Sequence, residues 1–178
     1  ELHALRRPAA TYFTSEDIAA FDRDTRVIYP LSKARAAAAL LAGPFRFGRR
    51  FWRALGSALF GRRESFRVRL LGLWHLAVAC HWAAGMRGRE VALIHSQWAH
   101  AGASVAMYGA QLLGAGFSFT GHAADLFRER AALNAKIDAA EFIVCISELP
   151  GPEQPAQQPI AHFAVKAGSG FGTIYNLQ

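Results

Sequence analysis

The chain has 178 residues, of which 52% are hydrophobic and 19% charged, and its formal net charge at pH 7 is +7. This length allows one domain with its own core, and this apolar content excludes an intrinsically disordered chain. The longest near-continuous apolar run, residues 70–84, is short for a membrane-spanning helix and is interrupted by His75 and His81, so we expect a buried helix there.

Short apolar runs alternate with helical segments, which is typical of an α/β fold with a mostly parallel sheet. The expected strands are 2–5, 26–31, 91–95, 117–120 and 142–146, and another could begin at 174. The expected helices are a segment after a capping box at Thr14 and Asp17, then 33–41 behind the cap Ser32, then 64–86, 101–113 and 128–139. Proline, glutamine and glycine dominate 149–170, which indicates a loop or linker.

The positive charge is concentrated in the first half of the chain. Residues 1–89 hold 16 Lys and Arg against 6 Asp and Glu, whereas residues 90–178 hold 4 against 7. Most of the excess lies in residues 46–69, which indicates a local basic surface. Cys80 and Cys145 lie in apolar surroundings without metal-ligand spacing, so we expect two reduced core thiols in a cytosolic protein.

Residues 45–63 combine aromatic side chains at helical spacing with surrounding arginines. Such a helix can lie in a membrane interface with its arginines on anionic head groups. The candidate membrane-binding residues are Arg49, Arg50, Phe51, Trp52 and Arg53. An equally weighted interpretation is an amphipathic helix that packs on the domain and leaves its arginines in solvent. Nucleic-acid binding is a weaker interpretation, because the segment holds no recognised binding motif.

Polar residues follow two neighbouring expected strands. The strand 91–95 runs into Gln97 and Trp98, and the strand 117–120 runs into Gly121, His122 and Asp125. Ligands of open parallel sheets bind beyond the carboxyl ends of the strands, and both tails emerge at that edge. Gly121 lets a ligand approach the backbone, and His122 can hydrogen-bond a phosphate or sugar oxygen. A loop or capping role for His122 is the competing interpretation.

The stretch IHSQWAHAGASVAMYGAQLLGAGFSFTGHAADLF, followed by KIDAAEFIVCISE, resembles the N-terminal domain of family 4 glycosyltransferases of the exopolysaccharide and lipopolysaccharide type. The resemblance covers residues 90–148, and its most specific part is Thr120 to Asp125. It implies a Rossmann-like three-layer domain that forms one half of a GT-B fold. On that basis we expect a domain at 1–148 without its first strand and helix, a poorly matching tail at 149–178, and no C-terminal donor domain.

The resemblance also implies an activity: retaining transfer of a sugar from a nucleotide sugar to a lipid-linked or polysaccharide acceptor, without a cofactor or essential metal. The implied catalytic residue is His122, which in the family reaches the donor sugar and its phosphate. The implied substrate-binding residues are Gln97, Trp98, Thr120, Gly121 and Asp125. Gln97 stands where relatives often have a second histidine, and Trp98 stands where they have phenylalanine. An amide can still hydrogen-bond an acceptor hydroxyl, and an indole offers a stacking face.

We therefore expect the acceptor-side part of a glycosyltransferase in the cytoplasm, peripheral at the inner face of the cytoplasmic membrane, and inactive as an isolated fragment. The expected partners are a nucleotide sugar, a lipid-linked saccharide acceptor and the anionic membrane surface, and not nucleic acid. The alternative is a non-enzymatic Rossmann-like module that binds anionic membranes through residues 45–63. A dinucleotide-binding domain is a weak third interpretation, because no Gly-x-Gly-x-x-Gly follows any strand.

Overall fold

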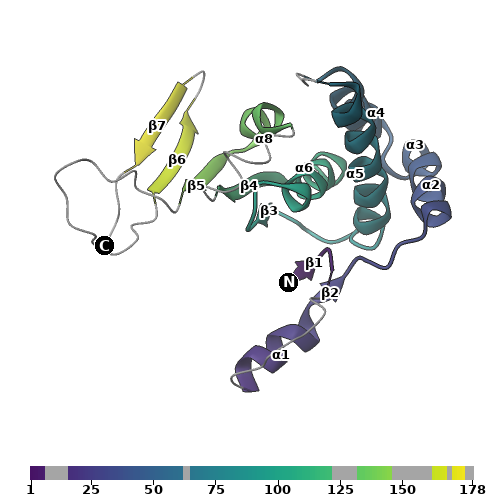
Figure 1. Cartoon of the computed structure of the whole chain (residues 1–178), viewed down its shortest axis with the longest axis horizontal. Coiled ribbons are helices and arrows are strands. Elements are labelled where there is room, and N and C mark those ends of the chain that lie inside the picture. The colour runs from purple at the N-terminus through teal and green to yellow at the C-terminus, as the bar shows by residue number, and fades with distance from the viewer. Residues whose placement is uncertain (7–15, 62–64, 122–131, 146–161, 168–169, 175–178) are drawn as a thin grey trace.

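The computed structural model describes residues 1–6, 16–61, 65–121, 132–145, 162–167 and 170–174 (Figure 1). These residues form an α/β structure with a two-stranded and a five-stranded sheet. Two predicted site residues, His122 and Asp125, lie outside the described residues, as do the predicted cap Thr14 and most of the predicted linker.

The five-stranded sheet contains the three strands expected between residues 90 and 148. These are β3 (Leu93–Ser96), β4 (Gly116–Gly121) and β5 (Phe142–Cys145), which lie side by side and run parallel. The helices α6 (Ala101–Leu113) and α8 (Leu133–Ala139) fall between them along the chain. The strand, helix, strand, helix, strand order predicted for this part is therefore confirmed.

The rest of the sheet differs from the expectation. β6 (His162–Ala167) pairs antiparallel with β5, and β7 (Gly170–Ile174) pairs antiparallel with β6, so the sheet is mixed. The prediction of a linker through 149–170 is wrong for 162–167, which form a strand. Backbone N–H and C=O groups of 162–167 form hydrogen bonds with the adjacent strand β5. The amino-acid composition of a segment does not indicate whether such a partner strand lies beside it.

The N-terminal strands do not join this sheet. β1 (His3–Ala4) and β2 (Arg26–Val27) form a separate parallel pair, with α1 (Glu16–Asp24) between them in sequence. Strands thus form within both of the predicted segments 2–5 and 26–31, but they are shorter than predicted and lie outside the five-stranded sheet. The pair is tied to the helices by a hydrogen bond from Trp82 Nε1 to His3 Nδ1 at 3.0 Å.

Helices make up the side of the molecule opposite β6 and β7 (Figure 1). α2 (Lys33–Leu41) begins where predicted, because the Ser32 hydroxyl accepts a hydrogen bond from the Arg35 amide. α5 (Phe66–Ala84) is buried at residues 75–80 and at Ala83, because α2, α4 and α6 all pack around it. Within the described residues, we find no helix both long and apolar enough to cross a membrane.

The face of the sheet that α6 covers forms the core. Ile94, Phe117, Phe119 and Ile143 alternate along the strands onto this face and are all buried. Small residues on α6 allow close packing: a Cβ added at Gly109 would lie 2.2 Å from a ring carbon of Trp82 on α5. α6 ends at Gly114, which adopts the left-handed conformation with φ of 75°.

The basic segment forms two helices rather than the single helix expected. α3 (Gly43–Phe47) and α4 (Arg49–Phe60) are separated by Gly48, whose φ of 54° and ψ of −129° are incompatible with a continuous helix. α4 packs against both α5 and α6. Its buried side is made of Phe51, Ala54 and Ala58.

Candidate functional site

The candidate site lies at the carboxyl edge of the parallel strands. The register pairs Ser96 at the end of β3 with Phe119 of β4, and β4 continues to Gly121. The carboxyl ends of β3 and β4 therefore lie at the same edge of the sheet. Gln97 and Trp98 follow β3 there and are exposed, with Trp98 at 47% exposure. His122 is the next residue after β4 in the sequence.

The loop after β3 is held by hydrogen bonds on both sides. Ser96 Oγ donates to the Trp98 carbonyl at 2.9 Å, and the Trp98 ring stacks on His100 with 5.7 Å between ring centroids. Lys136 Nζ reaches across from α8 and donates to the carbonyls of Ala99 at 2.5 Å and His100 at 3.0 Å. The indole of Trp98 is thus presented to solvent from an ordered loop.

Lys136 was not identified from the sequence. Its side chain is only 1% exposed, although a lysine on a short helix usually points to solvent. The one available signal is its place in the predicted helix, where Leu133, Ile137 and Ala140 would share its buried side. That spacing indicates that Lys136 lies near the core, but it does not identify the loop that Lys136 contacts.

On the sheet face opposite Ile94 and Phe119, β3 and β4 carry a cluster of polar side chains. The sequence analysis did not predict this cluster. His95 Nδ1 lies 2.8 Å from Ser118 Oγ, and His95 Nε2 lies 3.1 Å from Thr120 Oγ1. Burial lowers the pKa of His95, so the neutral ring, which donates at one nitrogen and accepts at the other, is favoured.

Two predicted substrate contacts at the end of β4 are buried. Thr120 is 3% exposed and its hydroxyl is engaged by His95, so it does not present a free group to a ligand. Gly121 is also buried and pairs with Cys145 of β5. The structure therefore leaves Gln97 and Trp98 as the accessible described residues of the predicted substrate site.

The predicted membrane-binding residues lie in three different environments. Arg49, Trp52 and Arg53 are exposed, and their spacing of three and four residues from Arg49 places them on one face of α4, which also carries the exposed Phe60 seven residues after Arg53. Phe51, in contrast, is 3% exposed and packs against Gly43, so its assignment to a membrane surface is wrong. Arg50 Nη1 donates to the Leu113 carbonyl at 2.6 Å and is held at the end of α6.

Cys80 is a core residue. Burial raises the pKa of Cys80 to about 12, and this thiol is buried in the core as expected. Across the described ranges, no three His, Cys, Asp or Glu side chains converge into a group that could hold a metal ion.

The carboxyl edge therefore combines an exposed aromatic ring with an exposed amide on a fixed loop. An aromatic face packs against the C–H side of a sugar ring, and an amide can donate to and accept from its hydroxyls. No family model, no curated protein and no solved structure matches this chain.

Proposed function

We propose that this chain is the acceptor-binding part of a retaining glycosyltransferase that acts on a lipid-linked or polysaccharide acceptor. The observation that carries the proposal is Trp98, a half-exposed indole in an ordered loop at the carboxyl edge of β3. The parallel arrangement of β3, β4 and β5 is compatible with the Rossmann-like half of a GT-B enzyme. The resemblance of residues 90–148 to family 4 glycosyltransferases is part of this proposal and is an expectation from the sequence alone.

Each residue of the proposed site has a distinct role. Trp98 stacks on an acceptor sugar, and Gln97 hydrogen-bonds an acceptor hydroxyl. His122 follows β4 and contacts the donor sugar or its phosphate, and Asp125 orients the imidazole. Thr120 acts indirectly, because its hydroxyl is bound to His95 and stabilises the end of β4.

Acceptor binding by this chain tests the proposal directly. We expect a water-soluble polysaccharide acceptor to bind the chain, and Trp98→Ala to weaken binding about three- to tenfold, which corresponds to the loss of one aromatic stacking contact. Trp52→Ala is the control, because Trp52 is also exposed but lies on α4, and this assay contains no lipid or detergent. Equal binding by both variants would show that Trp98 does not contact the acceptor.

Turnover tests the role of His122 in a chain joined to a matching donor domain. A hydrogen-bond donor aimed at transition-state charge supplies about 3–4 kcal/mol, so His122→Ala should lower kcat about 100- to 1,000-fold with little change in the acceptor KM. A normally folded His122→Ala enzyme with kcat within about threefold of the parent would remove His122 from the mechanism.

A second candidate function is binding to an anionic membrane surface. The observation that favours it is the exposure of Phe45 at 91%, Trp52 at 60% and Phe60 at 81% on the basic helices α3 and α4. Aromatic side chains insert at the interface, and each nearby arginine contributes about 1 kcal/mol.

Vesicle co-sedimentation tests this candidate. Arg49→Gln with Arg53→Gln should weaken binding to anionic vesicles by about 2 kcal/mol, and salt should weaken it further. Trp52→Ala should also weaken binding, and here Trp98→Ala is the control. Vesicle binding without any saccharide binding would favour a membrane-binding module over the glycosyltransferase.

A further inference from the structure

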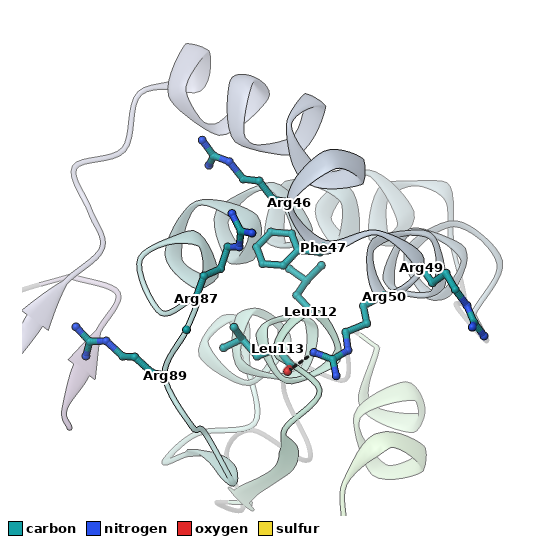
Figure 2. Close-up of a pocket in the computed structure, with 9 residues that line it drawn as sticks. Arg46, Phe47, Arg49, Arg50, Arg87, Arg89, Leu112 and Leu113 are labelled. Carbon is teal, nitrogen blue, oxygen red and sulfur yellow. Dashed lines mark hydrogen bonds between the residues drawn. The ribbon is translucent and has the colours of Figure 1, made fainter.

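A pocket of about 510 Å³ lies between α3, α4, the turn after α5 and the end of α6 (Figure 2). Five of its nine lining residues are arginines, and the others are mostly apolar. The lining residues are Arg46, Phe47, Arg49, Arg50, Arg87, Gly88, Arg89, Leu112 and Leu113. Arginines from segments about 40 residues apart in sequence thus gather at one concave surface.

This pocket is separate from the proposed glycosyltransferase site. α6 begins after the carboxyl end of β3 and runs back to the start of β4, so Leu112 and Leu113 lie at the amino edge of the sheet. Residues 87–89 likewise precede β3. Gln97 and Trp98 lie at the opposite edge, and a ligand in the pocket cannot be the acceptor bound there.

Two of the arginines have structural partners. Arg50 donates to the Leu113 carbonyl at 2.6 Å, which places positive charge at the carboxyl end of α6, where the helix dipole favours it. Arg89 Nη1 lies 2.6 Å from Glu1 Oε2. The carboxylate of Glu1 also pairs with Arg26 at 2.8 Å, so it is already shared between two guanidinium groups.

Arg46 and Arg87 are different. Among the residues that the structure describes, neither has an ion pair or a hydrogen bond from its guanidinium group. Figure 2 shows both side chains on the same side of the Phe47 ring, whereas Arg49 and Arg89 point outward. The hydrogen bond to the end of α6 explains the position of Arg50, but it does not explain why Arg46 and Arg87 line the same pocket.

Phosphate is the anion that best matches this arrangement. A guanidinium group binds phosphate oxygens through two parallel hydrogen bonds, and two such groups match the charge of a phosphate dianion. Phe47, Leu112 and Leu113 add an apolar wall beside the cations, which suits the organic part of a phosphate ester. We propose that this pocket binds a phosphate-bearing ligand through the guanidinium groups of Arg46 and Arg87. Arg50 lines the same pocket and is held in place by its hydrogen bond to the Leu113 carbonyl.

The phosphate can belong to a soluble diphosphate or to the head group of a phospholipid. Calorimetry with inorganic pyrophosphate probes the first source, and co-sedimentation with phosphatidylcholine vesicles, with and without phosphatidic acid, probes the second. The test variant is Arg46→Gln with Arg87→Gln. The charge-matched control is Arg23→Gln with Arg67→Gln, since both of these arginines are exposed and lie outside the pocket.

We expect saturable binding of one pyrophosphate per chain, weakened at least thirtyfold in the pocket variant and less than threefold in the control. If the natural source is a lipid, phosphatidic acid vesicles should show the same pattern and pyrophosphate should compete with them. Equal losses in both variants would mean diffuse attraction to a basic surface and would overturn the proposal. Absence of saturable pyrophosphate binding would overturn it as well. Neither result bears on Trp98 and the saccharide site.

Discussion

Replacing Lys136 by methionine tests how the loop at the carboxyl edge is held. Methionine keeps the apolar stem of the side chain but removes the ammonium group that donates to the carbonyls of Ala99 and His100. Ala99 is buried, so its carbonyl cannot exchange the lost donor for water. His100 is only half-buried, so its carbonyl can be rehydrated.

The magnitude follows from these two environments. A buried acceptor that loses its donor destabilises the folded state by about 1–3 kcal/mol. The rehydrated carbonyl adds little, and methionine avoids the desolvation of an ammonium group, which offsets part of the loss. We therefore expect Lys136→Met to lower the free energy of unfolding by about 1–3 kcal/mol.

Urea unfolding followed by circular dichroism measures this change. Lys33→Met is the matched control: it makes the same chemical change at an exposed position of α2 and should stay within about 0.5 kcal/mol of the parent. If the Lys136→Met chain is as stable as the parent, or loses no more than Lys33→Met, the two carbonyl contacts do not stabilise the fold and the reasoning is wrong.

Three further predictions concern buried or partly buried residues. Gly109→Ala should lower the free energy of unfolding by about 1–3 kcal/mol, because the added Cβ would lie 2.2 Å from a ring carbon of Trp82. Stability should fall as the pH drops below about 6.5, because burial lowers the pKa of His3 and the unfolded chain then binds the proton more tightly. In a Cys145→Ser background, Cys80 should resist iodoacetamide until urea is added, because burial raises its pKa to about 12.

The first two of these predictions have control variants. Gly56→Ala, at a position on α4 with open space around the new Cβ, should not destabilise the chain. His3→Gln keeps an acceptor for Trp82 but does not titrate, so it should reduce the acid-side loss. Part of that loss should persist because burial also lowers the pKa of His95. An unchanged pH slope in His3→Gln, or rapid alkylation of Cys80 in the native chain, would contradict the corresponding prediction.

The sequence by itself determined those helices and strands whose ends are marked by residues close to them in the chain. α2 and α6 have the predicted bounds, because Ser32 caps the first and Gly114 ends the second in a left-handed conformation. Caps and such terminations depend on residues within one helical turn. The strands β4 and β5 were also readable as short apolar runs. The edge position of Gln97 and Trp98 followed once these strands were expected to be parallel.

Contacts between distant segments were decided only by the tertiary structure. Lys136 and the loop that it holds are 36 and 37 residues apart, and their contact depends on where α8 lies. β6 depends on pairing with β5, and its own composition does not show this. Sequence periodicity carries no information on such pairings, because they are set by packing and not by local conformation.

The basic segment, residues 45–63, shows most clearly what the sequence determined and what the tertiary structure determined. Its sequence predicted a helical, positively charged surface with aromatic side chains. Only packing decided that Phe51 fills the space beside Gly43 while its neighbour Trp52 faces solvent. Packing likewise brought Arg46 and Arg87 to one pocket although they are far apart in the chain. Adjacent helical residues point about 100° apart, so the rotation of α4 about its axis, set by its contacts with α5 and α6, selects which side chains are available to a ligand.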